Sequence, residues 1–173
     1  MDAEAENAKS IAQELGVKSY PTIKYYSKGS TAPEAYEGGR TEEALLDFMN
    51  GKAGTHRMAG GKLSELGGTI PSLDSIIGRL AGGGTVASLL EELEGAANGL
   101  QDKYATYYVK VADKLNKNQG YAEKELSRLR GLLDKGGLAP EKVDDLMSRS
   151  NILVRFTSKD RVQDLVKDVR DEL

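Results

Sequence analysis

About the last hundred residues of the chain repeat apolar side chains at the spacing of an α-helix, and this pattern constrains the fold more than any other feature. From Pro71 onward, apolar residues recur every three or four positions, as they do on one face of a helix. Glycine or proline separates most of these stripes, because glycine favours helix ends and proline favours first turns. The stripes are Leu73–Leu80, Val86–Leu93, Tyr104–Val111, Leu126–Leu133, Val143–Phe156 and Val162–Val169. We expect a break at Gly82–Gly84 and an N-cap at Thr85 between the first two, and a helix from about Leu100 to Leu115 around the third. About five to six helices in this length predict a compact all-α domain.

The first part of the chain follows a mixed pattern. Residues 8–15 carry apolar side chains at i, i+3, i+4 and i+7, which predicts a short helix that ends at Gly16. Residues 22–26 (TIKYY) predict a strand, and residues 34–37 (EAYE) predict a second strand antiparallel to it. A further helix is expected from Thr41, a good N-cap, to Asn50-Gly51. We therefore predict an α+β chain whose first part is helix, two antiparallel strands, helix.

A glycine-rich stretch joins these two parts. Residues 51–70 (GKAGTHRMAGGKLSELGGTI) contain six glycines, and we predict a linker with a short helical turn near its end. The expected organisation is a first domain over residues 1–56, a linker over residues 57–70 and a helical domain over residues 71–173.

Composition excludes several classes of function. Lys plus Arg is 24 and Asp plus Glu is 27, a net charge of −3, so nothing favours binding to nucleic acid or to an anionic membrane surface. No apolar run approaches the roughly 20 residues that span a bilayer, and the acidic N-terminus does not resemble a signal peptide. With no cysteine and one histidine, we expect no thiol chemistry, no metal site and no cofactor.

Tyr20-Pro21 stands directly before the first predicted strand, where proline cannot donate a hydrogen bond to a sheet. From the residues alone a trans bond is favoured, because only about 5–6% of X-Pro bonds are cis. However, ENAKSIAQELGVKSYPTIKYYSKG and YEGGRTEEALLDFMN resemble the C-terminal half of a thioredoxin domain, as found in protein disulfide isomerases. The resemblance covers residues 1–56. It implies a cis Tyr20–Pro21 bond, because the matching pair in that family is cis and lies beside the active site.

The helical part carries a second resemblance. LQDKYATYYVKVADKL, YAEKELSRLRGLL and GGLAPEKVDDLMSRSNIL are similar to the helical C-terminal domain of endoplasmic reticulum protein 29, which some fungal and plant protein disulfide isomerases also carry. Together the two resemblances cover nearly the whole chain. Their order implies one branch of the disulfide isomerases.

The catalytic groups of that family are absent from this sequence. Its chemistry needs a Cys-x-x-Cys pair, with one thiolate to attack and a second thiol to resolve the mixed disulfide. The resemblance places that pair upstream of Met1; a fragment, a truncated gene model and a natural short form are all compatible with the sequence. We expect an endoplasmic reticulum folding factor limited to substrate-binding or chaperone roles, and inactive in redox chemistry by itself. The alternative is a non-enzymatic scaffold or escort protein that acts through the helical domain.

The resemblance also implies where a substrate binds. In such oxidoreductases the cis-proline loop pairs with an extended substrate chain, which makes Val17, Tyr20, Pro21 and Thr22 the expected contacts. The expected partners are unfolded or partly folded secretory proteins.

Two further surfaces are candidates for contact with partners. Tyr107 lies off the apolar stripe of its helix, so its ring is a candidate surface contact, whereas Tyr104 and Tyr108 are expected in the core. The strand Thr22–Tyr26 would lack a neighbour on one side, and it could pair with a second copy of the chain by strand addition.

The chain ends in Arg170-Asp171-Glu172-Leu173. This tetrapeptide resembles the Lys/His-Asp-Glu-Leu retrieval signal of the endoplasmic reticulum, and together with the disulfide isomerase resemblance it predicts a location in the lumen of that compartment. The alternative is a helix end whose acidic side chains are merely solvated.

Overall fold

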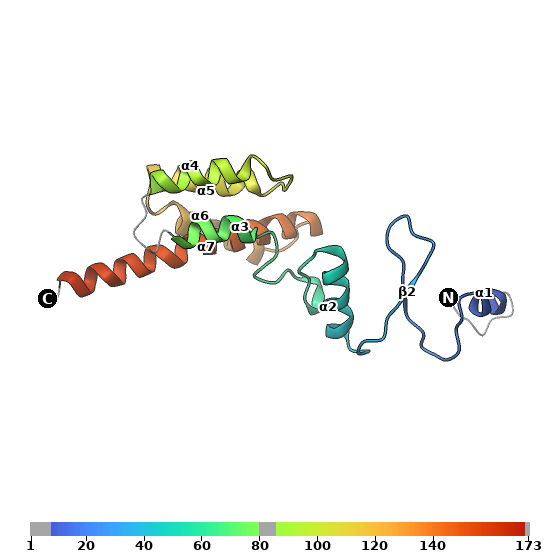
Figure 1. Ribbon diagram of the computed structural model, residues 1–173. Coiled ribbons are helices and arrows are strands. Elements are labelled where there is room, and N and C mark those ends of the chain that lie inside the picture. Colours follow the sequence, from blue (N-terminus) through green and yellow to red (C-terminus); the bar gives the residue numbers. More distant parts are fainter. Residues whose placement is uncertain (1–7, 80–85, 172–173) are drawn as a thin grey trace. The chain divides into compact units, whose positions relative to one another are not determined.

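The computed structural model describes residues 8–79 and 86–171, and the chain divides into two compact units, Met1–Phe48 (unit 1) and Met49–Leu173 (unit 2) (Figure 1). Side-chain burial is defined for residues 8–79 and 88–157. Among the described residues, every helix is too short or too polar to cross a bilayer.

Unit 1 has the predicted order of elements, with shorter strands than predicted. Helix α1 (Lys9–Glu14) is followed by β1 (Lys24–Tyr25) and β2 (Glu34–Ala35). The two strands are antiparallel, with Lys24 opposite Ala35 and Tyr25 opposite Glu34. Turns on either side of β1 limit its length, because Thr22 Oγ1 donates to Ser19 O and the Ser30 N–H donates to Ser27 O.

Helix α2 (Glu42–Ala53) begins where predicted and ends later. Thr41 is its N-cap, since Thr41 Oγ1 accepts the Ala44 N–H at 3.2 Å. The prediction that Asn50-Gly51 closes the helix is wrong. The Asn50 side chain is hydrogen-bonded to the main chain of Arg57 instead, and the helix continues to Ala53.

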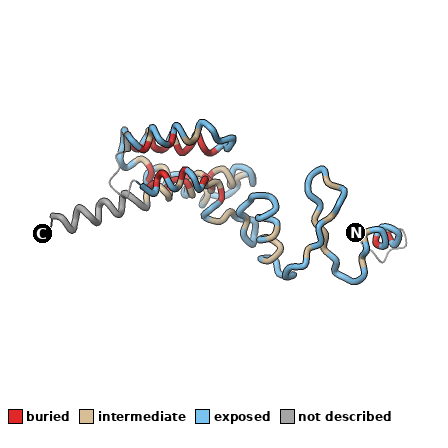
Figure 2. Tube along the Cα trace, viewed as in Figure 1, coloured by how far each residue is buried: buried red, intermediate tan, exposed pale blue. Residues whose placement is uncertain are grey.

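The packing of unit 1 is sparse. The ring of Phe48 contacts the rings of Tyr25 and Tyr36, with centroids 5.7 Å and 4.8 Å apart. Among the residues of this unit that the structure describes, only Ala8 and Ala12 are buried, and red is confined to the region of α1 in this unit (Figure 2).

The described part of unit 2 holds five α-helices, which confirms the α+β prediction for the chain as a whole. Helix α6 packs against α7, α4 packs against α5 and α3, and both α3 and α5 contact α7. The helices are α3 (Pro71–Gly78), α4 (Val86–Ala97), α5 (Ala105–Lys117), α6 (Tyr121–Asp134) and α7 (Pro140–Asp171).

Two helices of unit 2 differ from their predicted limits. Helix α5 begins at Ala105 and not near Leu100, because Asp102 turns the chain first: its carboxylate accepts the Tyr104 N–H at 2.7 Å. Helix α7 is one helix where the pattern predicted two. No glycine or proline follows Pro140, so nothing in the sequence stops it. The predicted break at Gly82–Gly84 and the predicted cap Thr85 lie outside the described residues.

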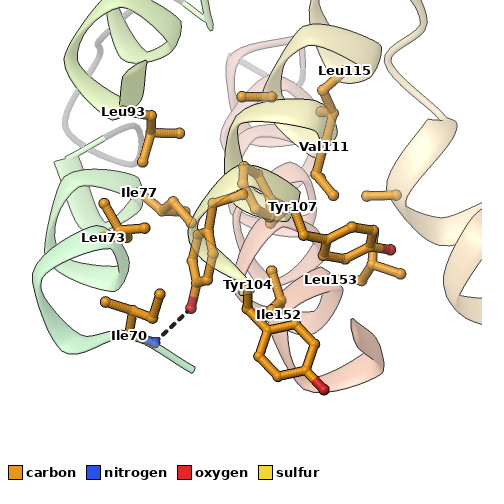
Figure 3. Close-up of a cluster of buried hydrophobic side chains, with 14 of the residues drawn as sticks. Ile70, Leu73, Ile77, Leu93, Tyr104, Tyr107, Val111, Leu115, Ile152 and Leu153 are labelled. Atoms are coloured by element: carbon orange, nitrogen blue, oxygen red, sulfur yellow. Dashed lines mark hydrogen bonds between the residues drawn. The ribbon is translucent and has the colours of Figure 1, made fainter. Parts of the chain in front are cut away.

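The core of unit 2 is continuous across all five helices (Figure 2). Tyr108, Leu73, Ile77 and Leu93 are completely buried. Figure 3 shows Leu73 and Ile77 of α3 on one side of α5, and Ile152 and Leu153 of α7 on the other side. Burial of these large side chains is the main source of stability in this unit.

Candidate functional sites: an exposed turn and a clamped segment

The predicted substrate contacts of unit 1 lie on one turn between α1 and β1. The Val17 N–H donates to Ala12 O at 2.8 Å, which ties the start of the turn to α1. The Tyr20–Pro21 peptide bond is cis, as predicted. Thr22 Oγ1 donates to Ser19 O at 2.5 Å and closes the turn before β1.

The exposure of this turn suits contact with another chain. The Tyr20 side chain is 56% exposed, Pro21 and Thr22 are exposed, and Val17 is half-buried. A proline and an exposed tyrosine ring offer apolar surface together with main-chain groups, which is the chemistry that binds an extended peptide. The turn offers no thiol, since the chain has no cysteine, and no described cluster of His, Asp or Glu residues could hold a metal ion.

Tyr107 lies in unit 2 and is not on the surface. Its side chain is 9% exposed and belongs to the core of the unit. The prediction of a surface ring is wrong, because α5 is covered by both α6 and α7, and Arg149 of α7 lies 5.2 Å above the Tyr107 ring. Among the described residues, its hydroxyl has no hydrogen-bond partner. Burial raises the pKa of Tyr107, with the nearby Tyr121 and Glu125 acting in the same direction.

The neighbouring Tyr108 is fully paired. Its hydroxyl donates to Asp74 Oδ1 at 2.6 Å and accepts the Ile70 N–H at 3.0 Å, the bond drawn in Figure 3. Burial is the main reason that the pKa of Tyr108 is raised, and the hydrogen bond to Asp74 adds to it. One hydroxyl thus joins α5, α3 and the residue that precedes α3.

Residues 57–70, which we predicted to be a linker and now call the strap, are hydrogen-bonded to helix α7. Arg57 forms a bidentate ion pair with Asp144, in which Nη1 donates to Oδ1 at 2.7 Å and Nη2 donates to Oδ2. The hydrogen bond from Arg57 lowers the pKa of Asp144, against a smaller opposing effect of burial. The strap starts with a small hairpin, in which Arg57 pairs with Leu63 and Arg57 Nη1 also donates to Gly61 O.

The contacts with the strap come from one side of α7. Asn151 Nδ2 donates to both Ser64 O and Gly67 O, at 2.8 Å and 2.9 Å. Arg155 Nη2 donates to Glu65 O at 3.4 Å. The residues of α7 that hold the strap are spaced i, i+4, i+7 and i+11, which is one face of a helix; we call them the α7 polar stripe. They are Asp144, Ser148, Asn151 and Arg155.

Gly68 packs directly on this stripe. Its φ is +78°, a conformation that favours glycine. A Cβ at this position would lie 2.9 Å from Ser148 Cα, which is too close for a real contact. Ser148 is buried on the side of α7 that faces the strap.

Sequence reasoning missed the strap contacts and the α7 polar stripe. A signal for the stripe exists, because Asp144, Ser148, Asn151 and Arg155 place polar side chains at helical spacing beside the apolar face of α7. No local signal identifies the strap as the segment that covers them. Of the predicted retrieval tetrapeptide, Glu172 and Leu173 lie outside the described residues.

Comparison with known families matches both parts of the chain. Residues 68–156 match the family described as endoplasmic reticulum protein ERp29, C-terminal domain. Residues 1–51 match the thioredoxin family.

Individual proteins match across the junction between these two parts. The chain is 53% identical over 173 residues to Protein disulfide-isomerase tigA of Aspergillus niger, a match that covers 100% of this chain and 45% of that protein. It is 50% identical over 163 residues to Protein disulfide-isomerase erp38 of Neurospora crassa, covering 92% and 44%. It is 34% identical over 161 residues to Protein disulfide isomerase-like 2-2 of Oryza sativa subsp. japonica, covering 90% and 43%. The chain therefore spans less than half the length of these relatives.

Proposed function

Since the chain belongs to the protein disulfide isomerase family and carries an ERp29 C-terminal domain, we propose that it binds unfolded or partly folded secretory proteins without exchanging their disulfides. Exchange requires an attacking thiolate and a mixed disulfide, and these 173 residues contain no cysteine. The isomerase activity in the names of the relatives belongs to chains of which this sequence covers 45% or less.

The observation that carries this proposal is the exposed turn around the cis Tyr20–Pro21 bond. Tyr20 is more than half exposed, and Val17, Pro21 and Thr22 lie in the same turn. An extended client segment would contact the tyrosine ring through apolar side chains and the turn through its main chain. These four residues are the proposed client contacts. Tyr107 is not among them, because its buried ring offers a client little surface.

A binding measurement tests this role. The full chain is titrated into a fluorescently labelled secretory protein that has been reduced, alkylated and kept unfolded, and anisotropy gives the Kd. Tyr20→Ser should weaken binding several-fold, whereas Leu100→Ser, which removes an exposed apolar side chain (37%) in unit 2, should leave the Kd unchanged. Equal Kd values for wild type and Tyr20→Ser would refute the turn as a client site. An insulin-reduction assay should show no turnover.

A second candidate function is that of a scaffold or escort protein acting through unit 2. It is favoured by the continuous core of unit 2, which makes that unit a rigid body for binding a folded partner. The two functions predict different locations for the variants that weaken binding. Client-binding variants should cluster at Tyr20 and its neighbours, while scaffold variants should map to exposed positions on α3 to α7.

Self-association through Thr22–Tyr26 is a further part of the proposal. The described sheet has two strands, β1 and β2, and strand addition by a second copy would extend it. Light scattering over a range of concentrations tests this idea. A chain that stays monomeric at the highest concentration would rule it out.

We also propose that the protein resides in the lumen of the endoplasmic reticulum, with the C-terminal tetrapeptide as its retrieval signal. The family name and the resemblance of Arg170-Asp171-Glu172-Leu173 to known signals support this location. A secreted reporter that ends in these four residues should be retained in cells, and the same reporter without them should reach the medium.

A further inference from the structure

We propose that the α7 polar stripe is a binding site for extended polypeptide, and that the strap occupies this site from within the same chain. The proposal goes beyond the client contacts of unit 1, because it places a second peptide site on unit 2. It depends on the proposed function only in taking an unfolded client as the external ligand. The site itself rests on the contacts between strap and stripe.

The stripe recognises mainly the backbone of the strap. Asn151 donates both of its described hydrogen bonds to main-chain carbonyls, those of Ser64 and Gly67. Arg155 donates to a third carbonyl, that of Glu65. Any polypeptide in a similar conformation supplies such carbonyls. A site built from these donors therefore accepts many sequences, as a binder of unfolded chains must.

Two contacts add selectivity at the ends of the site. Asp144 holds the Arg57 guanidinium through two parallel hydrogen bonds, a geometry that favours arginine over lysine. At the other end, Ser148 leaves no room for a Cβ on Gly68. The preferred ligand is thus an extended or turning segment with a basic residue at one end and a glycine toward the other.

We expect residues 57–69 of the strap to leave this site without unfolding the helices, while Ile70 stays in the core. Within residues 57–70 only Gly67 and Ile70 are buried, and most of the others are exposed. Ile70 belongs to the core of unit 2, but residues 57–69 are held mainly by hydrogen bonds and one ion pair, so this part of the strap buries little apolar surface. Segments of this kind open at a lower free energy than the core to which they are attached.

A peptide titration on the full chain tests the proposal. The probe is a fluorescein-labelled peptide with the sequence of residues 55–70, THRMAGGKLSELGGTI, and anisotropy gives its Kd. In the wild type the strap competes with the probe. Arg57→Ala removes the ion pair that holds the strap, so the open fraction rises and the probe should bind up to about fivefold more tightly. Adding Asn151→Ala in that background should weaken binding at least about tenfold, since two carbonyl contacts are lost.

Matched controls separate binding from loss of fold. Arg79→Ala also removes an ion pair, that with Glu92 of α4, and no described hydrogen bond or ion pair joins either residue to the strap; it should leave the Kd unchanged. Tyr20→Ser should also leave the Kd of the probe unchanged, which separates failure of this proposal from failure of the client site in unit 1. Far-UV circular dichroism confirms that each variant is folded.

A charge exchange gives a result that a purely structural role would not produce. In a chain with Asp144→Arg, a probe that carries aspartate at the position of Arg57 should bind at least about tenfold better than the original probe. Arg57→Ala chains keep Asp144 and should prefer the original probe, so the charge exchange reverses the preference. Failure of Arg57→Ala to tighten binding, insensitivity to Asn151→Ala, or no reversal with Asp144→Arg would each overturn the proposal.

Discussion

Unit 1 and unit 2 use apolar residues in opposite ways. Unit 2 buries them in one core that all five of its described helices share. Unit 1 is not poor in large apolar side chains, yet Ile11, Tyr20 and Tyr26 are 45%, 56% and 44% exposed. Its described elements are a short helix, two two-residue strands and the start of α2, which supply too little surface to enclose a core. An apolar pattern therefore predicts which face of an element could be buried, and the surrounding structure decides whether it is.

The first test of this contrast is the removal of one large side chain from each unit. Leu153→Ala should lower the free energy of unfolding of unit 2 by about 2–5 kcal/mol, because Leu153 is completely buried and its loss leaves a cavity. Ile11→Ala should change stability by less than about 0.5 kcal/mol. Urea denaturation followed by far-UV circular dichroism measures both. Equal effects would mean that Ile11 is buried in solution.

A second test compares two glycines. Gly68→Ala should destabilise unit 2 by about 2–4 kcal/mol, since alanine disfavours the positive φ and its Cβ would collide with Ser148. Gly29 in unit 1 has a φ of +81° with nothing within 4 Å of an added Cβ. Gly29→Ala should leave the unfolding of unit 2 unchanged. If Gly68→Ala proves harmless, the strap does not lie on Ser148 in solution.

Adjacent tyrosines provide a third, smaller effect within unit 2. Tyr108→Phe should cost about 1–3 kcal/mol, because it leaves the Ile70 N–H and the Asp74 carboxylate without their shared partner. Tyr107→Phe should be neutral or stabilising by up to about 1 kcal/mol, since it removes a buried hydroxyl without a partner in the part of the chain that the structure describes. Thermal or urea denaturation of the two variants distinguishes them. A large loss in Tyr107→Phe would reveal a bound water or another partner for that hydroxyl.

The smallest expected effect is a pH dependence of the strap. Asp144 has a pKa below its ordinary value of 3.8, because Arg57 donates hydrogen bonds to the ionised form. A carboxyl whose pKa is lower in the folded state stabilises the fold above its unfolded pKa, and this stabilisation is lost as pH falls through the folded pKa. For a partly exposed pair it is at most about 1 kcal/mol.

The measurement is the free energy of unfolding of unit 2 at pH values between 7 and 3. The wild type should lose more stability on acidification than Asp144→Asn. Arg57→Ala should show the same reduced slope as Asp144→Asn, since it removes the same hydrogen bonds. Identical slopes for all three chains would contradict the ion pair.

The sequence predicted the helices of unit 2 better than the surfaces that they cover. Apolar spacing with glycine and proline at the ends located α3, α4, α6 and the start of α7, because these signals are local. The prediction for Tyr107 was wrong because it assumed that a helix has a single buried face, the one that carries its apolar stripe. Helix α5 is covered by other helices on more than one side. An element in the interior of a bundle cannot be recognised from its own sequence alone.

The contacts of the strap could not be predicted either, and the physical reason is a different one. Its glycines indicate flexibility, and the interactions that remove this flexibility come from residues far along the chain: Arg57 and Asp144 are 87 positions apart, as are Ser64 and Asn151. The cis bond at Tyr20–Pro21 was predictable only in part. Residue statistics alone favoured trans, and only the family resemblance indicated cis.

The hydrogen bond from the Ile70 N–H to the Tyr108 hydroxyl has a consequence for how unit 2 can be moved between proteins. A fusion or gene rearrangement that joins a new partner directly at Pro71 removes the buried Ile70 side chain, keeps an N–H for Tyr108 only if the new residue is not proline, and discards the arginine that pairs with Asp144. A junction placed before Asn50 transfers these groups intact. The transferable cassette is therefore longer than its helices, and its N-terminal edge is set by main-chain and guanidinium groups outside them.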